Sequence, residues 1–122
     1  MRAAPPFAAS RGSGSGYAGA EPTAPLSEHA LSTCLAQLAE AAGDHAQAET
    51  LYAEAAERWR EFGNVPESAY ALLAQGRCLA SLGQAEADEP LREAQELFRS
   101  MGYKPALAET EALLGESEAA AV

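Results

Sequence analysis

An internal repeat with a period of 39 to 40 residues constrains this 122-residue sequence more than any other feature. Gly43 recurs 40 positions later as Gly83, and seven further pairs lie 39 positions apart. These pairs are Tyr52 with Leu91, Ala55 with Ala94, Trp59 with Phe98, Phe62 with Met101, Gly63 with Gly102, Pro66 with Pro105 and Gly76 with Gly115. A fixed period of this length is the signature of stacked repeats. The change from 40 to 39 indicates that the second repeat lacks one residue between Gly83 and Leu91, near the start of what would be its second helix, the fourth of the chain.

Each repeat unit has the periodicity of helices. In the first segment Leu31, Cys34, Leu35, Leu38, Ala39 and Ala42 recur at steps of three and four, which places them on one helix face. The first two predicted helices span about 27–42 and 45–62. A third starts after Pro66 and stops at Gly83, a fourth stops at Gly102, and Pro105 opens a fifth pattern that fades after Leu114. Ser27 can cap the first helix, and Asp44 with Gln47 forms a capping-box signature for the second. The sequence therefore predicts an all-α fold of about five helices, arranged as antiparallel helix-pair repeats in an α-solenoid.

The predicted core combines many alanines with a few large side chains. Hydrophobic residues make up 48% of the chain, but alanine buries little area per residue. Close helix approach and a set of large anchors must therefore supply the cohesion. The expected anchors are Leu51, Tyr52, Trp59, Phe62, Leu72, Leu79, Leu91 and Phe98.

The first 25 residues differ in composition from the rest of the chain. They contain four prolines and the run Gly12 to Gly16, in which glycine alternates with serine. Such a composition cannot bury enough apolar surface to offset the entropy of ordering. We therefore predict a disordered leader or linker over 1–25, followed by a repeat domain over 26–119.

Charge and cysteine content narrow the classes of partner and location. The formal net charge is -10, and the cations are scattered instead of forming a basic stripe. This pattern disfavours nucleic acid and anionic membrane surfaces as partners. Cys34 and Cys78 lie in helical patterns without metal-ligand spacing, so we expect reduced, partly buried thiols. No apolar stretch is long enough for a spanning helix, and a cytoplasmic location is expected.

The order of helix, glycine, helix and glycine within each period resembles the tetratricopeptide repeat. Gly43 and Gly83 match its inter-helix turn, Ala48, Tyr52 and Ala55 match its small, aromatic, small triplet, and Gly76 and Leu79 match its small and large positions. The resemblance covers residues 27 to about 118, as two repeats and the first helix of a third. The lengthened repeat, with a hydrophobic residue and Gly followed by Pro, looks like the C-terminal arrays of bacterial LuxR-type transcriptional regulators and cyclase-linked signalling ATPases.

This resemblance implies a module that binds a protein or peptide on the concave face formed by the first helix of each pair. The matching positions are Thr33, Gln37, Glu40, Tyr70, Leu73, Arg77, Glu109 and Ala112. Of these, Tyr70, Leu73 and Arg77 are the expected anchors, since Tyr and Arg contribute disproportionately to interfaces. Instead of binding a partner, Leu73 could serve only in packing between repeats, and Arg77 could serve only to keep the surface soluble. The alternative for the whole chain is a terminal fragment of a larger regulator with a structural role.

No pattern in the sequence indicates catalysis, a metal site or a cofactor. His29 and His45 are the only histidines, and each is expected to face solvent or to pack. In the fifth helix Glu111 stands at the position of Leu72, so this helix either caps the array or packs out of register. Because each helix pair leaves an apolar face that a neighbour must cover, we also expect self-association or docking through a terminal helix.

Overall fold

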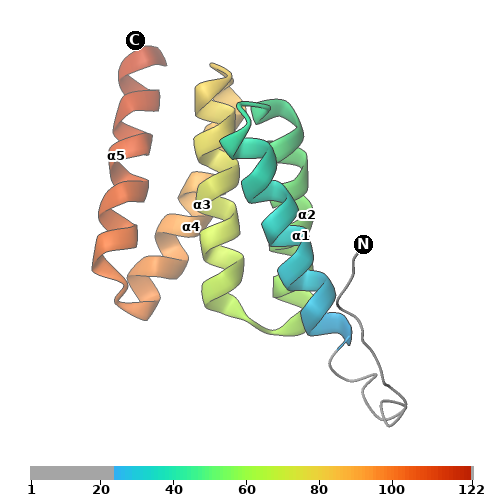
Figure 1. Ribbon diagram of the computed structural model, residues 1–122. Helices are drawn as coiled ribbons and strands as arrows, with labels where there is room; N and C mark the ends of the chain where they lie inside the picture. Colours follow the sequence, from blue (N-terminus) through green and yellow to red (C-terminus); the bar gives the residue numbers. More distant parts are fainter. Residues whose placement is uncertain (1–23, 122) are drawn as a thin grey trace, which may run out of the picture.

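The computed structural model describes residues 24–121, with side chains placed from 28 to 116. Its elements are α1 (Ala24–Ala41), α2 (His45–Phe62), α3 (Val65–Ser81), the short 3-10 helix η3 (Ala85–Ala87), α4 (Asp88–Met101) and α5 (Lys104–Ala121). Consecutive helices run antiparallel, and each packs against the next along the row (Figure 1). There is no strand within 24–121. The predicted all-α helical repeat is confirmed.

The ends of the described range differ from the predicted boundaries. The predicted leader lies outside the described residues except for Ala24 and Pro25, which already belong to α1. At the other end α5 continues to Ala121, although the apolar pattern fades after Leu114. Alanine and glutamate dominate that last stretch and favour a helix without an apolar stripe.

Side-chain caps and glycines set the helix boundaries within the array. Asp44 accepts a hydrogen bond from the Gln47 N–H at 3.1 Å, as the capping-box signature predicts. Asn64 caps α3 in the same way, accepting from the Glu67 N–H at 3.1 Å. The helix consequently begins at Val65 and not after Pro66, because proline fits the first turn of a helix, where its missing N–H has no partner to lose. At the end of α2, Gly63 has a φ of 92°, a left-handed conformation that favours glycine.

The residue missing from the second repeat has a visible structural consequence. The turn after Gly83 leads into η3, and the α-helical part of α4 is 14 residues long against 18 in α2. A 3-10 segment has fewer residues per turn than an α-helix and is often found at helix ends. The irregularity predicted near the start of the fourth helix is therefore absorbed by η3.

Two clusters of buried side chains form the core. The larger one lies between α2, α3, α4 and α5 around Trp59, Leu72, Leu91 and Phe98. The smaller one joins α1, α2 and α3 through Ala36, Ala48, Tyr52, Ala74 and Cys78. At the centre of the larger cluster, Gly76 lets α3 approach α4 so closely that a Cβ atom would collide with the Leu91 side chain.

Some predicted core positions are wrong. Phe62 is 45% exposed, because it lies in the last turn of α2 and reaches only the edge of the array. Leu51 is only partly buried. The apolar stripe of α1 is divided, since Ala36 and Ala39 face α2 while Leu31, Leu35 and Leu38 are exposed.

Candidate functional site

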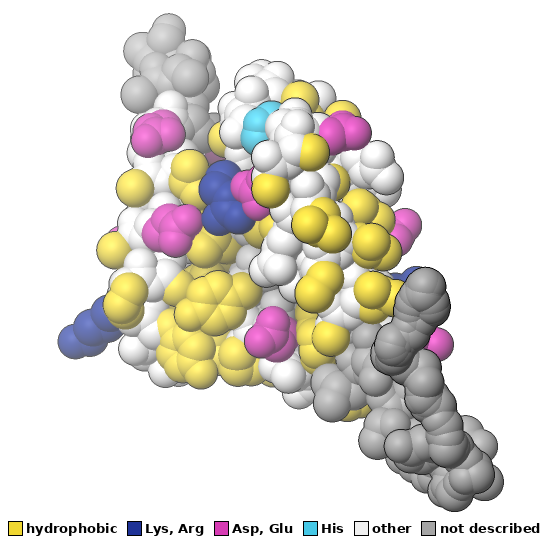
Figure 2. All heavy atoms as spheres, in the orientation of Figure 1, with side chains coloured by type: hydrophobic (Ala, Val, Ile, Leu, Met, Phe, Trp, Pro, Cys, Tyr) yellow, Lys and Arg dark blue, Asp and Glu magenta, His cyan; other side chains and the backbone are white. Residues whose placement is uncertain are grey.

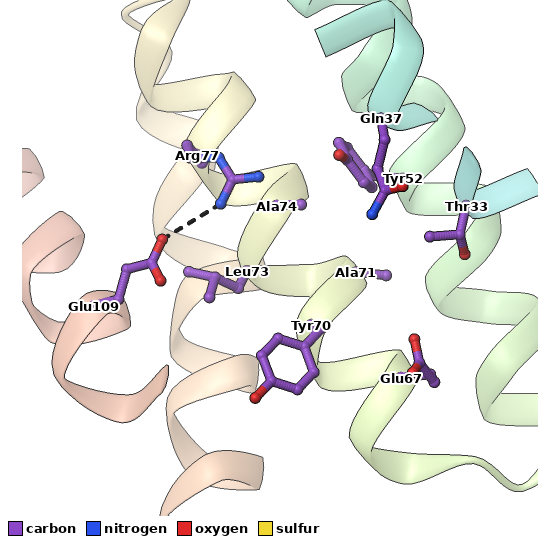
Figure 3. Close-up of a pocket in the computed structure, with 10 residues that line it drawn as sticks. All are labelled: Thr33, Gln37, Tyr52, Glu67, Tyr70, Ala71, Leu73, Ala74, Arg77 and Glu109. Atoms are coloured by element: carbon purple, nitrogen blue, oxygen red, sulfur yellow. Dashed lines mark hydrogen bonds and ion pairs between the residues drawn. The ribbon is translucent and has the colours of Figure 1, made fainter. Parts of the chain in front are cut away.

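A cavity of about 280 Å³ opens where α1, α3 and α5 face one another. Helix α3 supplies most of its lining, with two residues from α1 and one each from α2 and α5 (Figure 3). The lining residues are Thr33, Gln37, Tyr52, Glu67, Tyr70, Ala71, Leu73, Ala74, Arg77 and Glu109. In the space-filling view, a basic side chain on this face lies among acidic and hydrophobic side chains (Figure 2). We call this cavity the α3 pocket.

The structure brings six of the eight predicted site residues to the α3 pocket. They are Thr33, Gln37, Tyr70, Leu73, Arg77 and Glu109. Glu40 does not line the pocket, because it pairs with Arg77 at its margin. Ala112 is exposed on α5 and also lies outside the lining. The binding role of all eight residues stays a prediction.

Sequence reasoning missed Glu67, Tyr52, Ala71 and Ala74 in this lining. Glu67 stands three residues before Tyr70 and seven before Ala74, so helical spacing alone would have placed it on the same face. Tyr52 was assigned to the core, where most of its ring does lie, but its hydroxyl reaches the pocket side. No comparable sequence signal marks that hydroxyl.

A hydrogen-bonded network of charged and polar groups closes one side of the pocket. The Arg77 guanidinium donates to both oxygens of Glu40, from Nε at 2.6 Å and from Nη2 at 2.9 Å. The Tyr52 hydroxyl donates to Glu40 Oε1 at 2.8 Å, and Arg77 Nη1 approaches Glu109 Oε2 at 3.4 Å. Such a bidentate arginine–carboxylate pair fixes the relative orientation of the two side chains. The network joins side chains of α1, α2, α3 and α5.

The network shifts the pKa of its members. The hydrogen bond from Arg77 holds the pKa of Glu40 below its usual value, although burial acts in the opposite direction. The same bond raises the pKa of Arg77, and burial followed by the bond to Glu40 raises that of Tyr52. Glu40 and Arg77 are therefore charged at neutral pH, and Tyr52 remains a hydrogen-bond donor.

The three predicted anchors differ in what they offer to a partner. Tyr70 is 46% exposed, and its ring contacts Phe98 and Tyr103 at centroid distances of 5.0 and 6.4 Å. Leu73 is only 3% exposed, so it belongs to the floor of the pocket and to the core. Arg77 is engaged by Glu40 on two donors. The accessible lining of the pocket thus includes the Tyr70 ring, the exposed side chains of Gln37, Glu67 and Glu109, and the partly exposed Arg77.

The α1 side of the pocket is fixed by Trp59. Its indole Nε1 donates to Thr33 Oγ1 at 2.9 Å, and Thr33 in turn donates to the His29 carbonyl oxygen at 3.2 Å. The His29 ring packs on Trp59 and Phe62 at centroid distances of 5.3 and 5.1 Å. His29 therefore has the packing role that was one of its two predicted roles.

The described residues hold no group of three or more His, Cys, Asp or Glu side chains that could bind a metal ion. Within the same part of the chain, no helix combines the length and apolar character needed to cross a membrane. Both cysteines are free thiols, but only Cys78 is buried. Cys34 was expected to be partly buried and is exposed, because it lies on the uncovered side of α1.

The antiparallel helix pairs and the left-handed glycine turns between them define a class, the helical repeat proteins. Within that class, the family model of the tetratricopeptide repeat matches residues 27–100, and the chain belongs to this family. Tetratricopeptide repeats generally mediate protein–protein interactions and are typically non-catalytic. Neither the curated proteins nor the solved structures give a match to this chain.

Proposed function

We propose that this chain is a non-catalytic module that binds a protein or peptide segment in the α3 pocket. The observation that carries the proposal is the exposed ring of Tyr70 between the carboxylates of Glu67 and Glu109 in a concave surface. A half-exposed aromatic ring in a cavity offers contact area at a low entropic cost, which is typical of interface anchors.

The charges of the pocket favour a segment with lysine or arginine. Glu67 and Glu109 are the two carboxylates among the lining residues and Arg77 is the one cation, while Glu40 at the margin pairs with Arg77. Because Glu40 occupies two guanidinium donors, Arg77 is a poor receptor for an acidic segment. A cationic side chain can instead approach Glu67 and Glu109 and rest on the Tyr70 ring.

The test uses three synthetic 12-residue peptides that alternate glycine with lysine, glutamate or serine, measured by calorimetry against the full chain. The lysine peptide should bind, and Glu67→Gln should weaken it about three- to tenfold, as expected for one lost charge contact. Glu61→Gln is the matched control, since Glu61 is an equally charged, exposed residue on α2 outside the pocket.

Equal weakening by both variants would mean that the acidic protein attracts the peptide without a site. Binding of only the glutamate or serine peptide would refute the basic partner while keeping the pocket as a peptide site. A displayed library of random 12-residue peptides that yields no binder sensitive to Tyr70→Ala would refute the pocket itself.

A second candidate is a structural role as the terminal part of a larger LuxR-type or cyclase-linked regulator in bacterial signalling or transcription. The Tyr52–Glu40–Arg77 network supports it, because these side chains already satisfy one another and hold helices together. An adjacent coding region for an ATPase or DNA-binding domain would favour this reading. A cytoplasmic location, the lack of catalytic activity and the lack of direct nucleic-acid binding remain predictions.

A further inference from the structure

Arg77 forms ion pairs with two carboxylates, and the two pairs differ in geometry. Its guanidinium donates to Glu40 from Nε at 2.6 Å and from Nη2 at 2.9 Å, whereas Nη1 reaches Glu109 Oε2 only at 3.4 Å. Charge-assisted hydrogen bonds from nitrogen to oxygen are about 2.7 to 2.9 Å long, and longer contacts are weaker. The pair with Glu40 is therefore the strong one, and the pair with Glu109 is loose.

The surroundings of the two carboxylates differ in the same direction. The Glu40 side chain is 20% exposed and also accepts a hydrogen bond from the Tyr52 hydroxyl. The Glu109 side chain is 52% exposed, so water can take the place of Arg77 beside it. Breaking a largely buried ion pair leaves a charge without a partner, whereas an exposed pair contributes little. Arg77 is consequently fixed to Glu40 and easily separated from Glu109.

Glu109 has room for a further hydrogen-bond donor. Arg77 contacts one of its oxygens, Oε2, and an ionised carboxylate offers two oxygens with about four acceptor positions. Figure 3 shows the Glu109 carboxylate directed from α5 toward Arg77, while the Tyr70 ring lies further along the same side of α3. Glu109 is thus an acceptor in the pocket that Arg77 occupies only in part.

We propose that Arg77 Nη1 holds the place of a partner's cation at Glu109, and that a lysine or arginine side chain of the partner displaces it while Glu40 retains the guanidinium. This inference rests on the proposed function, because it assigns a cation-binding carboxylate in the same pocket. Arg77 then opposes a basic partner in two ways: it repels the incoming charge, and its contact with Glu109 must break before the new one forms. The wild-type pocket therefore binds a basic segment less tightly than its carboxylates allow.

A double-mutant cycle on Arg77 and Glu109, measured by calorimetry with the lysine peptide, tests the exchange. Arg77→Gln should strengthen binding about two- to fivefold, the value expected for one exposed ion pair that no longer has to break. Glu109→Gln should weaken binding more in the Arg77→Gln chain than in the wild type, because in the wild type the new contact is partly offset by the lost one. Circular dichroism checks that each variant is folded.

Arg60→Gln is the matched control for net charge. Arg60 is an exposed arginine on α2 that pairs with Glu57 and Glu93 outside the pocket. Its substitution changes the charge of the protein by the same amount as Arg77→Gln. It should strengthen binding of the lysine peptide less than Arg77→Gln does.

Nuclear magnetic resonance of the wild type provides a second readout that needs no substitution. When the lysine peptide is added, the signal of the Glu109 carboxyl carbon should shift, because its cation changes. The Nε–H group of Arg77 should remain protected from exchange with solvent, because its hydrogen bond to Glu40 stays intact. Loss of that protection would show that the guanidinium leaves Glu40, and it would overturn the proposal.

The outcomes of the cycle separate this inference from the proposed function. If the lysine peptide binds the wild type and Glu109→Gln weakens it equally in both backgrounds, the two positions are independent and only the exchange is refuted. A gain from Arg60→Gln as large as that from Arg77→Gln would attribute the effect to net charge and would also refute the exchange. Binding to the Arg77→Gln chain alone would support the exchange and show that Arg77 blocks the wild-type pocket. Absence of binding to every variant would refute both proposals.

Discussion

Removing the Trp59 side chain is the sharpest test of how this array is held together. Trp59 is 5% exposed and packs in the larger core cluster, between alanines of α2 and the leucines of α3. Its indole also donates to Thr33, which ties α2 to α1. The Trp59 side chain thus contributes both to the interface of α2 with α3 and to that of α2 with α1.

The expected loss for Trp59→Ala is about 3 to 5 kcal/mol of unfolding free energy, the range for a large aromatic residue removed from a core. Trp59→Phe keeps most of the ring but loses the hydrogen bond, so about 1 to 2 kcal/mol is expected. Arg77→Ala should cost about 1 kcal/mol, because its guanidinium remains partly exposed and solvent screens the pair with Glu40.

Urea unfolding followed by circular dichroism at 222 nm measures all three variants, since the chain has no other tryptophan for fluorescence. A small domain starts near the lower end of about 5 to 15 kcal/mol, so Trp59→Ala should unfold at low urea. If Trp59→Ala lost less than about 1 kcal/mol, or no more than Arg77→Ala, the assignment of Trp59 to the core would be refuted.

Two further predictions concern acid and packing. The hydrogen bond from Arg77 holds the pKa of Glu40 below its ordinary value in the folded state, so the contribution of Glu40 to stability is complete at neutral pH and is lost as the pH falls through the lowered folded value. The stability difference in urea between wild type and Glu40→Gln should therefore shrink from pH 7 to pH 3. A constant difference would contradict the role of the pair. Gly76→Ala should lower the free energy of unfolding by about 1 to 3 kcal/mol, because the new methyl group meets the buried Leu91 side chain. Gly115→Ala is the control and should be close to neutral, because a Cβ atom there meets nothing. Equal melting temperatures of these two variants would count against close approach of α3 and α4.

Much of the fold followed from local and periodic signals. The positions of the glycines predicted the turns, and Asp44 with Gln47 predicted a cap that the structure contains. These signals are readable because they depend on a few neighbouring residues. The start of α3 was misplaced because Asn64 was not recognised as its cap, although it precedes a Val-Pro pair that fits a first helical turn.

The candidate site was only partly predictable, because its properties depend on contacts between distant residues. Helical spacing and the family pattern indicated which side of α3 faces the pocket. They could not show that Glu40, 37 positions from Arg77, would take two of its donors. The exposure of Leu31 and Leu35 was likewise hidden, because an apolar stripe looks the same in a sequence whether or not a neighbouring helix covers it.

The two ion pairs of Arg77, with Glu40 and with Glu109, influence how unfolding spreads through the array. In a stacked repeat protein each unit senses only its neighbours, so either end can fray without affecting the other. Here one guanidinium contacts Glu40 on α1 and Glu109 on α5, two residues that stand 69 positions apart. Melting of the first helix therefore removes a contact that helps to hold Arg77 toward the last one. Arg77 on α3 thus links α1 and α5, and a ligand that separates Arg77 from Glu109 would directly remove one contact between α3 and α5.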